Sequence, residues 1–186
     1  NTTDGIHAFV VGDDYARPSS IGHFANRLSF VMRTTQYAAW RSSNNPQLVL
    51  ASYMPFTRDP APSCHPQPCN MLPWWQQHKP HLVLYQCDKV TPAWECFGGG
   101  ISCEAAHLSV PLDLTLPETL QYQMASAVLP AKRRGSNAIE LDNYNLFNEW
   151  SACGSFSGPG GAWVQRYNST DPKSDHQYVL DVLNWT

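Results

Sequence analysis

The chain has 186 residues, of which 42% are hydrophobic, 12% aromatic and 15% charged, and its formal net charge is -3. This length suits one domain with a sizeable core, and we expect a single domain over residues 1–186. The small net charge leaves no basic stripe, which argues against a nucleic-acid partner. No apolar run approaches the roughly 20 residues of a membrane-spanning helix, and no charged-then-apolar signal segment opens the chain. These features fit a mature secreted, extracellular protein.

The six cysteines are Cys64, Cys69, Cys87, Cys96, Cys103 and Cys153. Their even number, in Pro- and Gly-rich surroundings, indicates disulfide bonds formed in an oxidising compartment. The sequence allows several pairings. Short separations lose the least chain entropy on closure, which favours pairing the first with the second and the fourth with the fifth. Cys87 is then left to pair with Cys153.

Three Asn-x-Ser/Thr triplets begin at Asn1, Asn168 and Asn184. Such triplets are acceptors for N-linked glycans in secreted proteins. Glycans would also cover a surface that has few charged residues. We therefore expect a glycoprotein.

Apolar runs bounded by turn residues predict strands over residues 6–11, 47–54 and 81–88. The run Leu28–Met32 fits a strand or a helix. Residues 55–80 hold seven of the fifteen prolines and two cysteines, which predicts a cross-linked excursion on the surface. Residues 175–185 have helical spacing.

The stretch Val110–Trp150 predicts a strand, a helix and a second strand. A short apolar run ends at Asp113, a helix-like segment follows Pro117 and breaks at Arg134-Gly135, and a second apolar run ends before Asp142. Continuous apolar strands alternating with helices predict an α/β fold with a parallel sheet. We expect a partial or complete (β/α)8 barrel with a disulfide-bonded loop excursion.

Acids stand at the ends of several predicted strands. In parallel α/β folds the loops after the carboxyl ends of the strands form the active face, so Asp88, Asp113 and Asp142 are candidates for chemistry there. Strand alternation puts Glu140 on the same face as Asp142. For each acid a structural cap or turn is the alternative. The same applies to the pair at positions 13–14, Asp13 and Asp14, after the first strand.

The pattern Pro111–Asp113, Pro117, a helix, then Ala138–Tyr144 and Asn148 resembles a block of the endo-polygalactosaminidase-like glycoside hydrolases, which are (β/α)8 relatives. The resemblance covers roughly residues 79–167, and this chain has Leu141 where the family usually has proline. It implies that Asp142 is a catalytic aspartate with its partner acid on a later strand. Glycoside hydrolysis uses two carboxylates, one protonated and one ionised.

Flat aromatic rings stack on the apolar faces of sugars, which makes aromatic residues after strand ends candidates for binding, whereas core packing accounts for most tryptophans. The candidate substrate-binding residues are Asp88, Asp113, Glu140, Asn143, Tyr144, Trp94 and Trp150.

Other chemistries fit the sequence less well. Cys64-x4-Cys69 followed by His78-x2-His81 superficially resembles a zinc site, but prolines interrupt the segment and the compartment favours disulfides. Gly98–Gly100 lacks the Gly-Lys-Ser/Thr of a phosphate loop, and Gly154–Gly158 has Phe where a nucleophile elbow needs serine. We expect no metal and no cofactor.

Two functions follow from these observations. The first is a secreted glycoside hydrolase-like protein that acts on an extracellular polysaccharide. The second is a non-catalytic, glycosylated structural module of an extracellular fibre, wall or surface layer. A complete barrel takes about 250 residues, and an open parallel edge is a liability. The second interpretation therefore predicts a homo-oligomer or filament in which neighbouring copies complete one another's sheet.

Overall fold

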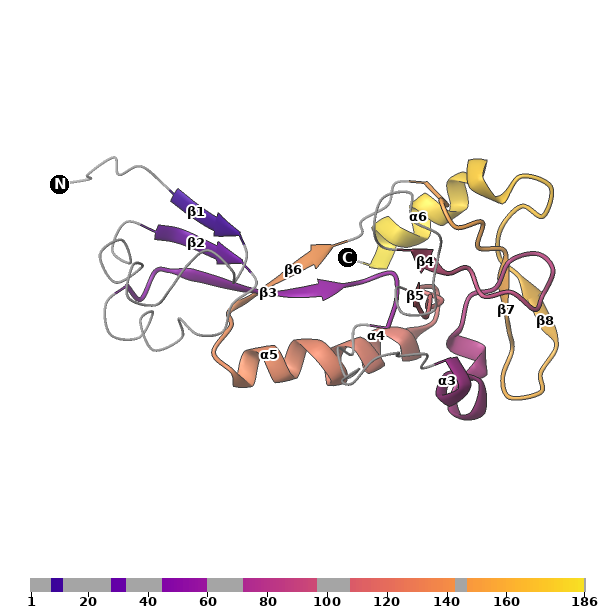
Figure 1. The fold of residues 1–186 in the computed structure, drawn as a ribbon, viewed down its shortest axis with the longest axis horizontal. Coiled ribbons are helices and arrows are strands. Elements are labelled where there is room, and N and C mark those ends of the chain that lie inside the picture. Colours follow the sequence, from indigo (N-terminus) through magenta and orange to yellow (C-terminus); the bar gives the residue numbers. More distant parts are fainter. Residues whose placement is uncertain are drawn as a thin grey trace. The chain divides into compact units, whose positions relative to one another are not determined.

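The computed structural model describes residues 8–11, 28–32, 45–59, 72–96, 108–142 and 147–185. The chain divides into two compact units, which are described separately (Figure 1). Unit 1 comprises Asn1–Met54 and Ala125–Asp142, and unit 2 comprises Pro55–Met124 and Asn143–Thr186.

The main element of unit 1 is a four-stranded sheet with the order β1-β2-β3-β6. Its strands are β1 (Ala8–Val11), β2 (Leu28–Met32), β3 (Val49–Pro55) and β6 (Ala138–Asp142). β1 pairs with β2 and β2 pairs with β3, both in parallel. β6 lies beside β3, and the arrowheads of these two strands point the same way in Figure 1. The strands therefore follow one another across the sheet in chain order.

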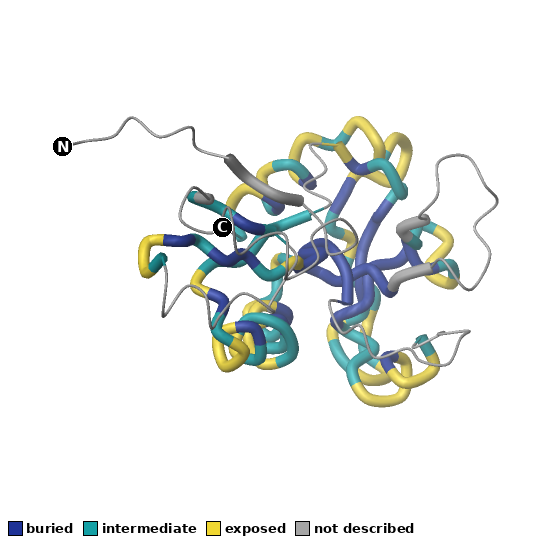
Figure 2. Tube along the Cα trace, turned by 60° about the vertical axis from the view of Figure 1, so that its left-hand side comes forward, coloured by how far each residue is buried: buried dark blue, intermediate teal, exposed yellow. Residues whose placement is uncertain are grey.

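The burial of β3 explains why its sequence could be recognised as that of a strand. Leu50 and Ala51 are fully buried and Met54 nearly so, and buried residues are dark blue in Figure 2. Strands covered on both faces have continuous apolar sequences, and the strand predicted over residues 47–54 is confirmed. The run Leu28–Met32, which fitted either element, is a strand.

A continuous helical segment precedes β6. It consists of α4 (Pro117–Gln123), a π-helical turn (Met124–Val128) and α5 (Leu129–Arg133). Pro130 has no N–H to donate to the preceding turn and its ring crowds that turn, which accounts for the local widening into a π-helix. The helix predicted after Pro117 is confirmed.

The end of this helix has the hydrogen bonds of a Schellman motif. Ser136 N donates to Ala131 O at 3.1 Å and Gly135 N donates to Lys132 O at 3.0 Å. Gly135 has a φ of 99°, a conformation that costs a residue with a Cβ atom. The predicted break at Arg134-Gly135 is confirmed, and the chain turns there directly into β6.

Unit 2 contains short elements. The helices are α3 (Leu72–His78), the 3-10 turns Pro80–Leu82 and Pro172–Ser174, and α6 (His176–Trp185). The antiparallel pairs are β4 (Glu95–Cys96) with β5 (Leu108–Ser109), and β7 (Gly154–Phe156) with β8 (Trp163–Gln165). The helix predicted over residues 175–185 is confirmed as α6. A buried cluster forms the core of the unit: Trp75, Leu82, Val83, Tyr85, Val110 and Leu112.

Two predicted strands of unit 2 are wrong. Residues 81–88 begin in a 3-10 turn and continue with isolated bridges, and Val110–Asp113 also makes only isolated bridges. Val83 bridges Leu112, and Tyr85 bridges Gly154, both in antiparallel orientation. These apolar runs are buried because they form the core of the unit. Burial of a short apolar run does not require a parallel strand.

Cys87 and Cys153 form a disulfide bond with a Cα–Cα distance of 5.0 Å, which confirms the predicted pairing. Cys64, Cys69 and Cys103 lie outside the described residues, and the side chain of Cys96 is not described. The fold is thus mixed α/β, with a parallel sheet in unit 1 and a disulfide in unit 2. Within the described ranges, no helix has the length and apolar character to cross a membrane.

Candidate functional site

Asp142 is the last residue of β6, at the carboxyl end of a strand of the unit 1 sheet. Glu140 precedes it by two residues, so the two carboxylates share one face of the strand. Both residues are half-buried. Asn143 and Tyr144, the next predicted site residues, lie outside the described part of the chain, as do Asp13 and Asp14 after β1.

The side chain of Asn137 attaches the start of β6 to β3. Its Oδ1 accepts a hydrogen bond from Leu50 N at 2.7 Å, and its backbone N donates to Leu50 O at 3.1 Å. Its Nδ2 also donates to Leu48 O at 3.4 Å. These bonds attach the residue that precedes β6 to β3. Sequence reasoning missed Asn137, because a lone asparagine before a strand gives no signal of a distant partner.

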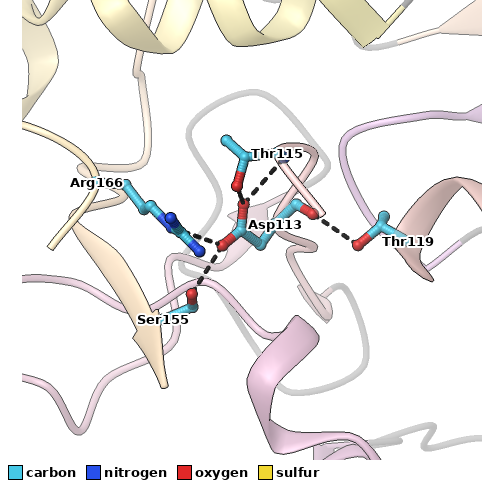
Figure 3. A network of polar contacts seen from close by, with 5 residues as sticks. All are labelled: Asp113, Thr115, Thr119, Ser155 and Arg166. Carbon is cyan, nitrogen blue, oxygen red and sulfur yellow. Dashed lines mark hydrogen bonds and ion pairs between the residues drawn. The ribbon is translucent and has the colours of Figure 1, made fainter. Parts of the chain in front are cut away.

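Asp113 lies in unit 2, where its side chain is completely buried (Figure 3). Its Oδ1 accepts hydrogen bonds from Thr115 N at 3.0 Å and Thr115 Oγ1 at 2.6 Å. Its Oδ2 accepts from Ser155 Oγ at 2.7 Å and from Arg166 Nε at 3.2 Å. A buried carboxylate needs such donors and a cation to offset the loss of water. These contacts fit the structural alternative to a substrate-binding role.

Asp88 also lies in unit 2, on an exposed turn. Its Oδ1 accepts hydrogen bonds from Val90 N and Thr91 N, each at 2.9 Å, and its Oδ2 accepts from Thr91 Oγ1 at 2.5 Å. The Thr91 hydroxyl, followed by the two backbone N–H groups, lowers the pKa of Asp88. This pattern is an Asx turn, which needs no ligand to explain it.

Two of the predicted aromatic candidates, Trp94 and Trp150, are half-buried residues of unit 2. Trp94 packs against the core cluster. The Nε1 of Trp150 is buried, with no hydrogen-bond partner among the residues that the structure describes. Asn148, two residues before Trp150, is buried. Its Nδ2 donates hydrogen bonds to Ala152 O at 2.7 Å and to Pro172 O at 2.8 Å, and its Oδ1 accepts one from Ala152 N at 2.8 Å. Asn148 therefore holds the loop that carries Trp150.

Asp59 is a buried acid that sequence reasoning did not single out. Its Oδ2 accepts a hydrogen bond from Trp75 Nε1 at 2.9 Å, and its Oδ1 accepts from Tyr122 OH at 3.0 Å. The two rings also touch edge to face, with centroids 4.8 Å apart. Asp59 thus connects α3 to α4. The Pro-rich sequence around it predicts a surface segment, so sequence reasoning gave no sign of this role.

Three charged or titratable side chains meet beside α3. Glu118 Oε1 contacts Lys79 Nζ, and Glu118 Oε2 lies 2.7 Å from His81 Nε2. His81 first, and then Lys79, lowers the pKa of Glu118. The Nδ1 of His81 is buried without a hydrogen-bond partner in the described structure. An ionised carboxylate can only accept, so His81 Nε2 is the donor in its contact with Glu118.

Two buried tyrosines have raised pKa values. Burial raises the pKa of Tyr85. Burial, followed by the negative charge of Asp181, raises the pKa of Tyr167. Both hydroxyls therefore stay protonated at neutral pH, and neither tyrosine is suited to act as a base.

Two of the three predicted glycosylation sites lie in described residues. Asn168 is exposed, and its Oδ1 accepts hydrogen bonds from Thr170 N at 2.8 Å and Asp171 N at 3.3 Å. Asn184 is exposed near the end of α6. Asn1 lies outside the described residues. Both described asparagines have the exposure that a glycan needs.

The described residues contain no group of three or more His, Cys, Asp or Glu side chains that could hold a metal ion. Comparison of the chain with protein-family models, curated proteins and solved structures finds no match.

Proposed function

We propose that this protein is a secreted glycoside hydrolase-like enzyme that acts on an extracellular polysaccharide, with Asp142 as a catalytic carboxylate. The observation that carries the proposal is the position of Asp142 at the carboxyl end of β6 in the unit 1 sheet. Catalytic residues of (β/α)8 enzymes stand at the carboxyl ends of strands.

The strand order supports a barrel-like architecture. In a (β/α)8 barrel the parallel strands follow one another in chain order, whereas a doubly wound sheet reverses its order at a switch point. The four strands of the unit 1 sheet have the sequential order.

The chemistry requires two carboxylates that flank the scissile bond. Asp142 supplies one. Glu140 lies on the same face of β6, at a spacing of about 6.6 Å between Cα atoms two residues apart on a strand. Among the described acids, Glu140 is therefore the one to replace first. Its replacement tests whether the second catalytic carboxylate lies on the same strand as Asp142.

The disulfide and the exposed sequons support secretion. Cys87 and Cys153 form a bond that persists in oxidising compartments. Asn168 and Asn184 are exposed. A secreted enzyme would meet polysaccharides outside the cell.

The test is release of reducing ends from a panel of soluble polysaccharides that includes chitosan, a β-glucan and polygalacturonate. Wild type, Asp142→Asn and Glu140→Gln are compared with Asp171→Asn, which removes the charge of an exposed acid. Turnover by wild type and by Asp171→Asn, with loss of roughly 10²- to 10⁴-fold in Asp142→Asn, supports the proposal. Absence of turnover from the whole panel, together with a native mass that is a multiple of 20.8 kDa, would favour the structural module.

A further inference from the structure

The triplet that begins at Asn168 lies on an exposed loop of unit 2. The loop follows β8 and leads into the 3-10 turn Pro172–Ser174. Asn168 and the three residues after it are exposed, whereas Tyr167 before them is buried. The buried tyrosine thus anchors the start of the loop, and the triplet is open to solvent. An enzyme that modifies an asparagine side chain needs this access.

The backbone of Asn168 is held in place, while its side chain keeps a free amide nitrogen. Asn168 N donates a hydrogen bond to Asp175 Oδ2 at 2.5 Å. Its Oδ1 accepts from Thr170 N at 2.8 Å and from Asp171 N at 3.3 Å, which is an Asx turn. Its Nδ2 has no hydrogen bond to any residue that the structure describes, whereas Nδ2 of Asn148 donates to two carbonyl oxygens. A glycan on Asn168 Nδ2 therefore breaks no bond of the described fold.

The Asx turn also favours the chemistry of N-glycosylation. In that reaction Nδ2 forms a bond to the anomeric carbon of an oligosaccharide that is linked to a lipid pyrophosphate. The carbon–oxygen bond to the pyrophosphate breaks, its electron pair leaves with the pyrophosphate, and Nδ2 gives one proton to the transferase. As the amide loses its proton, negative charge develops on Oδ1. The two backbone N–H groups that donate to Oδ1 stabilise this charge.

Asn184, which begins the other described triplet, has a different environment. It is the penultimate residue of α6, and backbone N–H groups in a helix bond to carbonyl oxygens four residues earlier. The ring of the next residue, Trp185, packs against Phe56 with centroids 5.1 Å apart, and Phe56 is completely buried. An Asx turn at Asn184 would require the end of α6 to unwind and Trp185 to leave this contact. The residue that follows Asn168 is instead the exposed Ser169.

We propose that Asn168 is the principal N-glycan acceptor among the described residues, and that Asn184 is modified in a smaller fraction of molecules. The inference rests on the secretion that is part of the proposed function, because this modification belongs to secreted proteins. It adds which triplet is used and the hydrogen bonds that select it. The bland alternative is an exposed turn that carries no glycan, and the test distinguishes the two.

The test measures the modified fraction of each asparagine separately. The chain is expressed behind a secretory leader in a eukaryotic cell line, and protein from the medium and from the secretory membranes is digested with trypsin. Cleavage after Arg166 and Lys173 places Asn168 in the peptide 167–173, and Asn184 in a peptide that begins at Ser174. Enzymatic removal of the glycan converts a modified asparagine to aspartate, which mass spectrometry detects. We expect most of peptide 167–173 to be converted, and a smaller fraction of the other peptide.

Variants of the triplet provide the controls. Asn168→Gln and Thr170→Ala abolish the modification of peptide 167–173, because an acceptor needs asparagine followed two residues later by serine or threonine. Thr170→Ala keeps the backbone N–H that donates to Asn168, so it remains informative if Asn168→Gln does not fold. Ser169→Ala keeps the acceptor pattern and stays modified. Unmodified Asn168, or a modified fraction at Asn184 equal to or above that at Asn168, overturns the inference.

The glycan and the hydrolase fail separately. Modified Asn168 in a protein that turns over no polysaccharide leaves the glycan and removes the hydrolase. Turnover that is abolished by Asp142→Asn, in a protein whose Asn168 is unmodified, leaves the hydrolase and removes the glycan.

Discussion

The side chain of Asn137 accepts a hydrogen bond from the backbone N of Leu50 at 2.7 Å, across 87 residues of sequence. This bond attaches Asn137, the residue before β6, to β3, the strand beside β6 in the sheet. The strand that carries Asp142 is thus bonded to its neighbour by a polar side chain at its opposite end.

Replacement of Asn137 tests this dependence. Asn137→Ala removes the acceptor of Leu50 N and leaves that donor without its partner, which lowers the free energy of unfolding by about 1–2 kcal/mol. Asn137→Asp keeps an acceptor for Leu50 N but replaces the donor to Leu48 O by a carboxylate oxygen, so it is also less stable than wild type. Urea denaturation followed by circular dichroism measures both. Equal stability of Asn137→Ala and wild type would show that β6 is positioned by its backbone bonds alone.

Removal of the buried carboxylate of Asp113 has a larger effect. Asp113→Ala leaves Arg166 without its carboxylate and Ser155 without its acceptor, which lowers the free energy of unfolding by about 3–5 kcal/mol. Asp171→Ala is the control, since Asp171 is exposed and exposed substitutions stay within about 0.5 kcal/mol. Thermal denaturation distinguishes the two. A change of less than about 1 kcal/mol in Asp113→Ala would contradict a structural role.

The disulfide between Cys87 and Cys153 stabilises the fold by restricting the unfolded chain. The two cysteines are 66 residues apart in sequence, for which the chain-entropy relation gives about 4 kcal/mol at 25 °C. The double variant Cys87→Ala/Cys153→Ala loses this contribution. The denaturant concentrations at which wild type and the double variant are half unfolded measure the lost stability. Identical midpoints would mean that the buried core alone stabilises unit 2 and that the disulfide bond adds nothing.

Glu118 gives the stability of the protein a small dependence on pH. Its pKa lies below the ordinary value of 4.5, because His81 and then Lys79 stabilise the carboxylate. A depressed pKa contributes stability above pH 4.5 that is lost as the pH falls through the lower pKa of the folded state. The side chain is 43% exposed, and solvent screening limits the contribution to about 0.5 kcal/mol. The free energies of unfolding of wild type and Glu118→Gln are measured at pH 7 and pH 3. The difference between the two proteins should be larger at pH 7. A constant difference would rule out this linkage.

The sequence predicted the elements whose pattern is strong. The apolar run before Pro55 and the helix between Pro117 and Gly135 were both found within a few residues, because burial on both faces and helix-terminating residues leave direct marks on the sequence. The Cys87–Cys153 pairing followed from chain entropy once the short separations were assigned.

The elements that were mispredicted depend on tertiary packing. The runs after Lys79 and before Asp113 are as apolar as strands, yet they are buried in antiparallel bridges around Trp75. Composition alone does not distinguish these two outcomes. The polar partners of Asp59 and Asn137 were missed for a related reason, since each hydrogen bond joins segments far apart in the chain.

The most direct test of the central claim is the ratio of kcat/KM for wild type and Asp142→Asn on the polysaccharide that wild type hydrolyses best. Both proteins are first shown to have the same melting temperature, and Asp171→Asn is measured beside them. We predict a loss of roughly 10²- to 10⁴-fold in Asp142→Asn and none in the control, as expected when a carboxylate that acts on the bond is neutralised. An Asp142→Asn protein that is folded and as active as wild type would contradict the assignment of Asp142.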